Sequence, residues 1–380
     1  MRVGVDYTSA VRQRAGIGRY TRELVAALLS VDDVHQYTVF AATGGLESRD
    51  WRSGIDRAGV QVRALPITDD WLARLWHRLR LPIPVELLTG PLDVFYSPDF
   101  TLPPTRRGTK TILTVHDLSF VHYPDAFVPS LRRYLENAVP RSVRRADLVL
   151  ADSSRTRSDL ISLFEVSPEV VKVVYPGVGS RFRSEPRAGE RERLRERYGV
   201  VDGPYVLGVG TLQPRKNYLY LMEGFNRLPV SLNAELQLLI AGGHGWLCDE
   251  VVAEADRREN IRILGFVEDD DLPALYRGAS LFAFPSLYEG FGLPVLEAMA
   301  CGAPVISSGT SSLPEVCGDA ALLVDPLIPG ELTEAMIRLL EDTELRDQLV
   351  TRGLARAATF TWERSARSLL DLIESLTDAR

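Results

Sequence analysis

Short runs of β-branched and apolar residues alternate with amphipathic stretches of helix length along almost the whole chain. Such alternation is typical of parallel sheets whose two faces are both covered by helices. In the first half we expect strands at residues 3–7, 37–41, 60–64, 94–97, 110–115, 148–151 and 171–174. In the second half we expect them at 205–209, 236–241, 261–264, 281–284, 304–307 and 321–324. The pattern predicts an α/β fold with doubly wound sheets.

Length and one break in the pattern indicate two domains. The chain has 380 residues, more than the roughly 150 of an ordinary domain. A turn at Tyr175-Pro176-Gly177-Val178 precedes a charge-rich stretch, residues 190–197, which we expect to form an exposed helix with internal ion pairs. We therefore expect two Rossmann-like domains, over 1–178 and 179–360, and a C-terminal helix over 361–380 that packs back on the first domain.

Composition and charge exclude several classes of protein. Hydrophobic residues make up 45% of the chain and charged residues 25%, as in globular proteins. No apolar run approaches the roughly 20 residues of a membrane-spanning helix, and the first residues lack the pattern of a signal peptide, so we expect a cytoplasmic protein. The net charge of -7 argues against a nucleic-acid partner. Cys248, Cys301 and Cys317 have no metal-binding spacing and indicate buried, reduced thiols.

Charge is unevenly distributed along the chain. Residues 1–180 hold 23 basic and 20 acidic residues, whereas residues 181–380 hold 21 and 31. The first half also has a group of five arginines, at positions 132, 133, 141, 144 and 145. This group is either a solvated helix face or a surface for an anionic partner, such as the inner face of a membrane.

Residues 288–302 form the most informative motif, Tyr-Glu-Gly-Phe-Gly-Leu-Pro-Val-Leu-Glu-Ala-Met-Ala-Cys-Gly. Glu289 follows an expected strand, and Glu297 lies in an expected helix that begins near Pro294 and ends at Gly302. Carboxylates at these two places could hold hydroxyl groups on either side of a bound diphosphate. The alternative is an ordinary strand, turn and helix with two surface acids.

The turn within this motif favours anion binding. Gly290 and Gly292 allow close backbone approach, and Phe291 beside them looks exposed. The amide groups of Gly292 and Leu293 can then face an anion at the positive end of the helix. Together with the two glutamates, this arrangement predicts a site for a nucleotide sugar.

The chain resembles the retaining family-4 glycosyltransferases of the GT-B fold over essentially its full length. A second stretch that matches this family is residues 210–217, which follow the first strand of the second domain. The resemblance implies that Arg215 and Lys216 hold the donor diphosphate and that Gly210 lies beside the donor. A guanidinium supplies a bidentate fork and an ammonium a point charge, which suit a leaving group that gains negative charge.

The resemblance implies three further contacts with the donor. Gly16 and Gly18 let backbone amides approach a phosphate from the first domain, although Ala15 departs slightly from the family pattern. His116 lies against the transferred sugar, where it stabilises charge at the anomeric centre or bonds a hydroxyl. Val267 packs against the nucleotide base through main-chain contacts.

The implied activity is transfer of a hexose to an acceptor hydroxyl with retention of configuration, in a cleft between the two domains. Glu289 would bond the sugar hydroxyls and Glu297 the ribose, and the departing diphosphate would take the acceptor proton. No metal or other cofactor is expected. Residues 114–124 and 144–147 most resemble mannosyltransferases of bacterial polysaccharide assembly. The expected donor is therefore GDP-mannose, with UDP-sugars second, and the expected acceptor is a saccharide or a lipid-linked saccharide.

Several alternatives stay open. The acidic run Asp269-Asp270-Asp271 contains a metal-binding spacing, but we expect it to cap the start of a helix. A nucleotide-sugar epimerase and a non-catalytic carbohydrate-binding scaffold could share the fold. A nicotinamide dehydrogenase is disfavoured because Gln213 stands where its fingerprint requires glycine.

A mixed aromatic, aliphatic and basic stretch at residues 71–81 also has two interpretations. It either packs inward through Trp71, Leu75 and Leu79, or it faces outward. An outward face would rest on lipid headgroups, as in a peripheral membrane contact, or shape an acceptor groove.

Overall fold

The computed structural model describes residues 1–14, 16–46, 51–52 and 54–378. Ala15, where the glycine-rich turn departs from the family pattern, lies outside these residues. The chain divides into two compact units. Unit 1 contains residues 1–118, 133–177 and 361–380, and unit 2 contains residues 119–132 and 178–360. The segment 119–132 therefore groups with unit 2, although it interrupts the first half of the sequence.

Unit 1 is built on a seven-stranded sheet in which all neighbouring strands are parallel. Its order, β3-β2-β1-β4-β5-β6-β7, reverses direction between β1 and β4. The strands are β1 (Arg2–Asp6), β2 (Gln36–Ala42), β3 (Val60–Leu65), β4 (Val94–Ser97), β5 (Lys110–Val115), β6 (Leu148–Ala151) and β7 (Val171–Val173). Nearly continuous burial of β4, β5 and β6 reflects helix cover on both faces.

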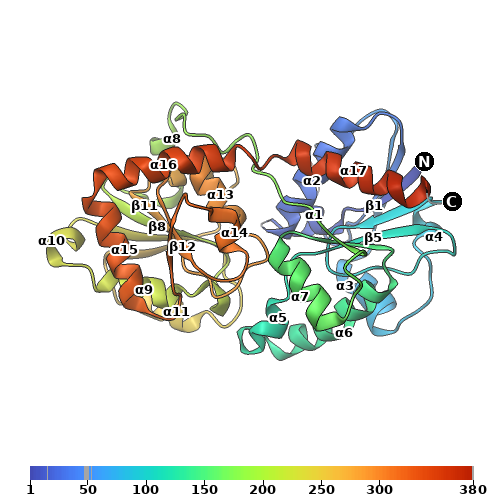
Figure 1. The fold of residues 1–380 in the computed structure, drawn as a ribbon, viewed down its shortest axis with the longest axis horizontal. Helices are drawn as coiled ribbons and strands as arrows, with labels where there is room; N and C mark the ends of the chain where they lie inside the picture. The colour runs from blue at the N-terminus through green and yellow to red at the C-terminus, as the bar shows by residue number, and fades with distance from the viewer. Residues whose placement is uncertain (15, 47–50, 53, 379–380) are drawn as a thin grey trace. The chain divides into compact units, whose positions relative to one another are not determined.

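The helices of unit 1 vary in length, from four residues in the shortest to 17 in the longest. They are α1 (Thr8–Arg12), α2 (Ile17–Val31), α3 (Asp69–Ala73), η1 (Arg74–Arg78), α4 (Glu86–Thr89), α6 (Pro129–Arg145, in unit 1 from residue 133), α7 (Ser154–Phe164) and α17 (Trp362–Asp378). Leu24, Val25 and Leu28 of α2 are completely buried, as the 3.6-residue period predicts. The C-terminal helix α17 lies beside α2, where Trp362 contacts Tyr20 edge to face at 5.7 Å (Figure 1).

Unit 2 is built on a six-stranded parallel sheet of order β10-β9-β8-β11-β12-β13. Its strands are β8 (Tyr205–Val209), β9 (Gln237–Ala241), β10 (Ile261–Gly265), β11 (Leu281–Phe284), β12 (Val305–Ser308) and β13 (Leu322–Val324). The order reverses between β8 and β11, so the loops that follow these two strands diverge. In open parallel sheets, ligands bind at such a reversal.

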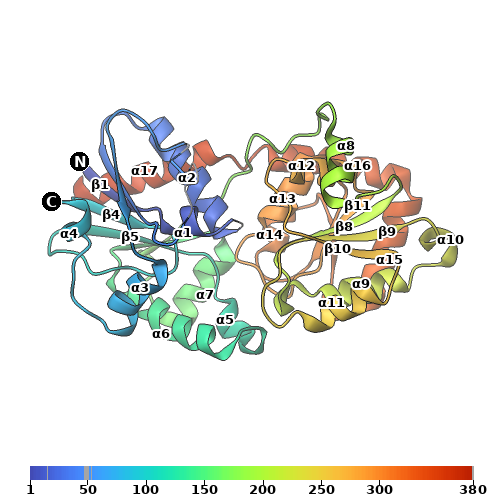
Figure 2. The same cartoon turned by 180° about the vertical axis from the view of Figure 1, so that it is seen from behind.

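Helices lie on both faces of this second sheet (Figure 2). The helices of unit 2 are α5 (Ser119–His122), η2 (Pro124–Ala126), α8 (Glu190–Tyr198), η3 (Pro214–Lys216), α9 (Tyr218–Asn226), α10 (Val230–Asn233), α11 (Asp249–Asp256), α12 (Leu272–Gly278), α13 (Leu293–Ala300), α14 (Leu313–Cys317), α15 (Pro329–Glu341) and α16 (Thr343–Ala357). The three cysteines are free and buried, as expected. Among the described residues, no helix has the length and apolar character needed to cross a bilayer.

The charge-rich helix α8 differs from its prediction. Glu190 is buried and pairs with Arg277 of α12. Arg193 and Arg197 bond the carboxylate of Asp271, at 3.3 and 2.9 Å. The helix is therefore attached to α12 by ion pairs, whereas the sequence suggested pairs within the helix, because the buried carboxylates require cationic partners.

The stretch at residues 71–81 faces outward at the positions expected to pack inward. Trp71 is 54% exposed and Leu79 is 66% exposed, while Leu72 and Trp76 are buried. The inward packing of Trp71 and Leu79 was therefore wrong. For Leu79 the error has a physical cause: the preceding η1 is a π-helical turn, which shifts the side chains that follow it away from the 3.6-residue period. Trp71 precedes η1 and lies in the first turn of α3.

Candidate active site

The strand reversal in unit 2 brings together three charged side chains from distant parts of the sequence. Arg215 and Lys216 lie in η3, which follows β8, and Glu289 lies in the loop that follows β11. Lys216 Nζ is 2.7 Å from Glu289 Oε1, and Arg215 Nη1 is 2.7 Å from Glu289 Oε2. Each carboxylate oxygen thus has its own cationic partner.

These three side chains are largely removed from water. Glu289 and Lys216 are 7% and 8% exposed. Burial alone would raise the pKa of Glu289, but the charges of Arg215 and Lys216 lower it to about 2. The Lys216 ammonium also lies 4.6 Å from the centre of the Phe284 ring, a favourable cation–π contact. The site therefore holds one ionised carboxylate and two cations, and its local charge is positive.

The backbone around η3 is held by Asn217, a residue to which the sequence analysis gave no role. Asn217 has φ of 61°, and its Nδ2 donates to the carbonyls of Pro285 and Pro326, at 3.2 and 2.8 Å. Arg215 Nη1 also donates to the carbonyl of Tyr288 at 3.1 Å. Asparagine tolerates the left-handed region better than most residues, and its position directly after Lys216 was the available signal.

A second missed group fixes the loop that carries Glu289. Ser308 donates to the Ser286 carbonyl at 2.6 Å, and Ser312 donates to the Glu289 carbonyl at 2.9 Å. The Glu289 amide donates to Ser311 Oγ at 3.0 Å. Ser308 ends β12, and Ser311 and Ser312 follow it in the run Ser-Ser-Gly-Thr-Ser-Ser. This cluster of short hydroxyl residues at the end of a strand was the available signal.

The helix that follows Glu289 begins and ends as expected. Gly292 has φ of 121° directly before α13, and a Cβ there would lie 2.7 Å from Leu313 Cδ2, so glycine is required. Gly302 has φ of 77° just after the helix. Phe291, in contrast, is 5% exposed and contacts Phe360 at 5.6 Å. The expectation of an exposed Phe291 was wrong, because this ring belongs to the core of unit 2.

Three more residues were expected to bind the donor: Gly210, Glu297 and Val267. Gly210 lies beside Lys216, and Glu297 and Val267 are buried. Gly210, with φ of 145°, accepts a 2.7 Å hydrogen bond from Tyr218 through its carbonyl, and a Cβ on it would lie 3.1 Å from Lys216 Cε. Glu297 is 2% exposed, and its Oε2 accepts a hydrogen bond from Tyr276 at 3.0 Å. The Val267 side chain is buried in the core. Glu297 is thus outside the triad of Arg215, Lys216 and Glu289.

Asp271, the last residue of the acidic run, does not cap α12 through its side chain. Asp271 is 2% exposed, and its side chain makes no hydrogen bond to the backbone amides of α12. Its Oδ1 bonds Arg193, and its Oδ2 accepts from Arg197 at 2.9 Å and from Tyr198 at 3.0 Å. The capping prediction was therefore wrong for Asp271, since arginines outcompete helix amides for a buried carboxylate.

In unit 1, His116 directly follows β5 and both of its ring nitrogens have partners. Nδ1 is 2.7 Å from Asp152 Oδ2, and Nε2 is 2.8 Å from the Pro98 carbonyl oxygen. Both partners are acceptors, so both nitrogens must carry protons. Burial lowers the pKa of His116, but the charge and hydrogen bond of Asp152 raise it to about 9. Tyr20 of α2 packs against the ring at 4.7 Å.

His116 stands among three carboxyl groups that also follow strands of unit 1. Asp6 ends β1, Asp99 follows β4 and Asp152 follows β6. Burial raises the pKa of Asp6 to about 6, and it raises the pKa of Asp99 and Asp152. The sequence analysis missed all three, although each lies within two residues of the carboxyl end of its strand, as His116 does. A residue at the carboxyl end of a parallel strand was the available signal.

The two glycines at the start of α2 have different structural reasons. Gly16 has φ of 54°, and among the described residues, its chain neighbours apart, no atom lies within 4 Å of the position of a Cβ. A Cβ on Gly18 would lie 1.9 Å from the Gln13 carbonyl oxygen. Packing between α2 and the end of α1 therefore accounts for Gly18 without a ligand.

The segment 119–132 reaches the neighbourhood of Glu289 within unit 2. The ring of His122 stacks on Tyr288 with centroids 4.8 Å apart. Trp246 Nε1 donates to the Ala126 carbonyl at 2.7 Å, and the Trp246 ring lies 5.8 Å from Phe127. The segment 119–132 therefore contacts Tyr288, the residue directly before Glu289.

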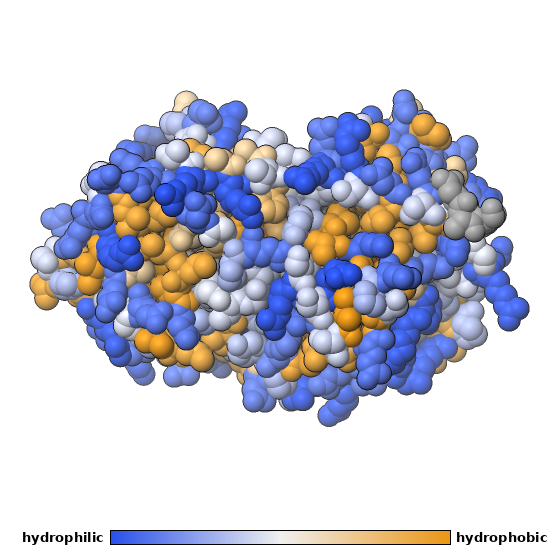
Figure 3. Space-filling model, in the orientation of Figure 1, coloured by the Kyte–Doolittle hydropathy of each residue, from blue (hydrophilic) through white to orange (hydrophobic). Residues whose placement is uncertain are grey.

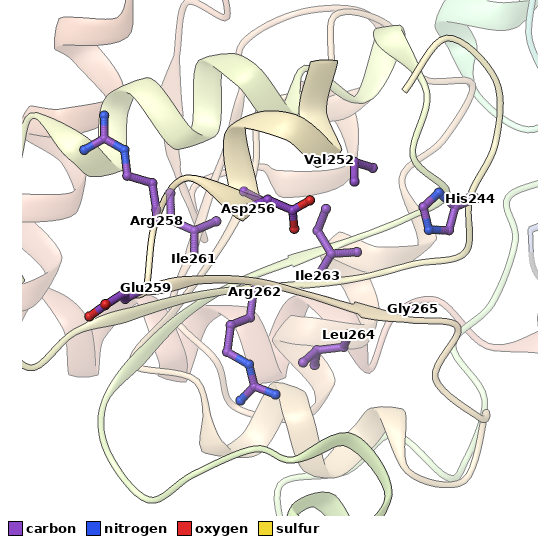
Figure 4. Close-up of a pocket in the computed structure, with 11 residues that line it drawn as sticks. His244, Val252, Asp256, Arg258, Glu259, Ile261, Arg262, Ile263, Leu264 and Gly265 are labelled. Carbon is purple, nitrogen blue, oxygen red and sulfur yellow. The ribbon is translucent and has the colours of Figure 1, made fainter. Parts of the chain in front are cut away.

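A separate groove in unit 2 runs along the edge strand β10, on the side of α11 (Figure 4). His244 and Gly265 lie at one end of it, and Ile261 and Ile263 line its apolar part. The residues of the triad do not line this groove.

Comparisons with known proteins identify the family. Residues 14–180 match the model "Glycosyltransferase Family 4", and residues 190–356 match "Glycosyl transferases group 1". The chain is 33% identical over 360 residues to O-antigen chain mannosyltransferase B of Escherichia coli, covering 92% of this chain and 93% of the relative.

Solved structures show the same fold. Sucrose-phosphate synthase from Thermosynechococcus elongatus superposes with a TM-score of 0.75 at 21% identity, covering 100% of both chains. HepE from Anabaena, in complex with UDP and glucose, superposes with a TM-score of 0.73 at 19% identity, covering 98% of this chain and 99% of that one. The two parallel sheets and the matches along both halves show that the chain belongs to the family-4 glycosyltransferases of the GT-B fold and is mannosyltransferase-like.

Proposed function

We propose that the protein transfers mannose from GDP-mannose to a hydroxyl of a saccharide or lipid-linked saccharide, with retention and without a metal ion. The observation that carries this proposal is the buried triad in unit 2. Two cations held around one carboxylate, at the point where the strand order reverses, suit a diphosphate leaving group beside a sugar. The mannosyltransferase relative supports mannose as the sugar and polysaccharide assembly as the process.

Arg215 and Lys216 act on the leaving group. The bond between the anomeric carbon and the diphosphate oxygen breaks, and the acceptor oxygen bonds the anomeric carbon on the same face. The acceptor proton passes to the departing diphosphate. Negative charge grows on that diphosphate in the transition state, and buried cations stabilise it more strongly than exposed ones would. The amides of Gly292 and Leu293 at the start of α13 add donors of the same kind.

Glu289 has two successive partners in this proposal. Without donor, it neutralises part of the charge of Arg215 and Lys216, to which it is bonded. When the diphosphate takes over the cations, the carboxylate becomes available to accept hydrogen bonds from sugar hydroxyls. Glu297 contributes to ribose binding, and the main chain near Gly210, Gly290, Phe291 and Val267 contributes to the rest of the nucleotide.

Unit 1 contributes His116 as a fixed positive charge. Asp152 and the Pro98 carbonyl hold both ring protons, so His116 does not act as a base in this state. The space beside Gly16 is open, so backbone amides at the start of α2 can bind a phosphate there. Gly18 supports that turn through its close packing.

Transfer without a metal ion is supported by the surroundings of Asp271. Both of its oxygens already accept hydrogen bonds from arginine or tyrosine, so a metal would have to displace them.

The test combines a donor panel with product analysis. The protein is incubated with GDP-mannose, UDP-glucose or UDP-N-acetylglucosamine, with and without saccharide acceptors, and release of the nucleoside diphosphate is measured. We expect the fastest release from GDP-mannose, the largest rise in melting temperature with that donor, an α-linked product and no change in EDTA.

Each part of the proposal has its own contradicting result. An epimerised free sugar without acceptor would indicate an epimerase, and nucleotide binding without turnover would indicate a scaffold. Faster turnover of a UDP-sugar would show that GDP-mannose is not the preferred donor. A β-linked product would exclude retention of configuration. Loss of activity in EDTA with rescue by Mn²⁺ would point to Asp269 and Asp271 as metal ligands.

A further inference from the structure

Exposed apolar side chains are concentrated in one part of unit 1. Most of the face drawn in Figure 3 is hydrophilic, with apolar residues in smaller groups. Among the described residues, fourteen large apolar side chains are strongly exposed, and five of them fall between residues 71 and 87. These are Trp71, Leu79, Leu81, Ile83 and Leu87. We call the exposed side chains of residues 71–87 the 71–87 surface.

The backbone under the 71–87 surface is fixed by hydrogen bonds. The amides of Leu79 and Leu81 donate to the carbonyls of Arg74 and Leu75, at 2.8 and 2.9 Å. The buried Trp76 donates through Nε1 to the Ile83 carbonyl at 2.9 Å. The exposed leucine and isoleucine side chains are therefore held outward by an ordered turn.

Arginines alternate with these apolar side chains. Arg74, Arg78 and Arg80 are exposed, and residues 71–85 contain no acidic residue. Of the acids at the two ends, Asp69 pairs with Arg12 at 2.8 Å, Glu86 is buried, and Asp70 is exposed beside Trp71. The exposed arginines of the stretch outnumber this one remaining carboxylate. Burial lowers the pKa of His77 to about 4, so its ring is neutral near pH 7. The 71–87 surface is therefore apolar and cationic at once.

A loop next to this surface adds to its positive charge. The Val85 amide donates to the Pro104 carbonyl at 2.8 Å, and the Arg106 amide donates to Glu86 at 2.9 Å. Arg106 and Arg107 in this loop are exposed. The helix α6 also lies alongside, since Arg78 covers the Tyr134 ring at 5.9 Å and α3 and α6 are neighbours in both ribbon views (Figures 1 and 2).

We propose that the 71–87 surface docks the protein on a bilayer that contains anionic phospholipids. Arginines bind the phosphate groups of such lipids, while tryptophan, leucine and isoleucine enter the boundary between headgroups and acyl chains. A second copy of the chain is a poorer occupant, because two symmetric copies would bring these arginines together. This docking does not depend on which donor sugar is used.

The experiment is sedimentation of the full chain with vesicles of phosphatidylcholine alone or with 30% phosphatidylglycerol. We expect binding to the anionic vesicles only, weakened by salt. The pair Arg78→Gln and Arg80→Gln should reduce that binding about 30-fold, because each arginine near an anionic surface contributes about 1 kcal/mol of attraction. The pair Leu79→Ser and Leu81→Ser should reduce it at least about tenfold. All four side chains are exposed, so folding should be retained.

A matched control is the exposed Val230→Ser in unit 2, which should leave vesicle binding unchanged. The Trp71 fluorescence, isolated by comparison with Trp71→Phe, should shift to shorter wavelength when anionic vesicles are added. Equal binding to neutral vesicles, no binding, or binding that the paired variants do not change would overturn the proposal. So would a dimer without vesicles that the leucine pair converts to monomer, since the surface would then be an interface between copies.

Discussion

The two units have related strand orders but place opposite charges at the carboxyl ends of their strands. In unit 2, Arg215 and Lys216 surround a single carboxylate, Glu289, and local charge is positive. In unit 1, three aspartates follow strands β1, β4 and β6 around the single His116, and acidic groups are in excess. A common topology therefore presents one site suited to an anion and another suited to hydroxyls or positive charge.

This local contrast is the reverse of the overall charge distribution. Residues 1–180, which include the acidic cluster, have a small excess of basic residues, and residues 181–380 have a large excess of acidic ones. Exposed charges are screened within about 8–10 Å at physiological salt, whereas buried ones are not. The few side chains buried at the strand ends thus decide what each unit can bind.

Of the variants that test this contrast between the two units, Lys216→Ala should change activity the most. Lys216→Ala takes one of the two cations from the leaving group, and we expect kcat with the preferred donor to fall about 10²–10³-fold. The measurement is release of nucleoside diphosphate at saturating donor. Arg227→Ala is the control, because Arg227 is an exposed cation that pairs with Glu223 in α9. Similar losses in both variants would show that the effect is not specific to the triad.

Removal of the Glu289 charge should separate turnover from binding. In Glu289→Gln the two cations lose their internal partner, so we expect affinity for the free nucleoside diphosphate to rise about fivefold while turnover falls about 100-fold. Calorimetry gives the affinity and donor release gives the turnover. Glu223→Gln, at an exposed Arg–Glu pair, should change neither. Weaker nucleotide binding in Glu289→Gln would contradict the idea that the carboxylate competes for the cations.

The smallest effect concerns stability in unit 1 and its dependence on pH. The pKa of His116 is about 9 in the folded chain, against an ordinary value of 6.5. Its protonation therefore stabilises the fold fully below pH 6.5, and this stabilisation is lost as pH rises to about 9. We expect the melting temperature to fall by about 2–4 °C over this range, and by less in Asp152→Asn, which removes the charge that raises the pKa.

Asp147→Asn is the control for that measurement. Asp147 also lies next to β6 but bonds Lys110 and Thr111, away from His116. Its replacement should lower stability at every pH and leave the pH dependence unchanged. Equal pH dependence in the wild-type protein and in Asp152→Asn would show that the His116–Asp152 contact does not hold the proton.

Much of the fold was predictable because strands here are buried on both faces. Runs of β-branched and apolar residues located the thirteen strands found among the described residues, and β4, β5, β6, β8 and β11 have the expected bounds. Parts of the site were predictable for a related reason. Arg215, Lys216 and Glu289 follow strands of the predicted sheet, and ligands bind at that edge. Asn217, Asp152 and the serines after β12 obey the same rule but have side chains common in ordinary turns.

The sequence by itself determined the alternation of strands and helices, the parallel sheets and the residue types at their carboxyl ends, because these depend on local periodicity and burial. Tertiary structure decided which side chains meet. Glu289 pairs with cations 73 residues away and more, and Asp271 pairs with α8 where capping was expected. It also decided that Leu79 faces solvent, since the π-helical turn η1 before it changes the direction of side chains without changing the sequence pattern. Contacts between distant residues depend on strand order, which local periodicity does not encode.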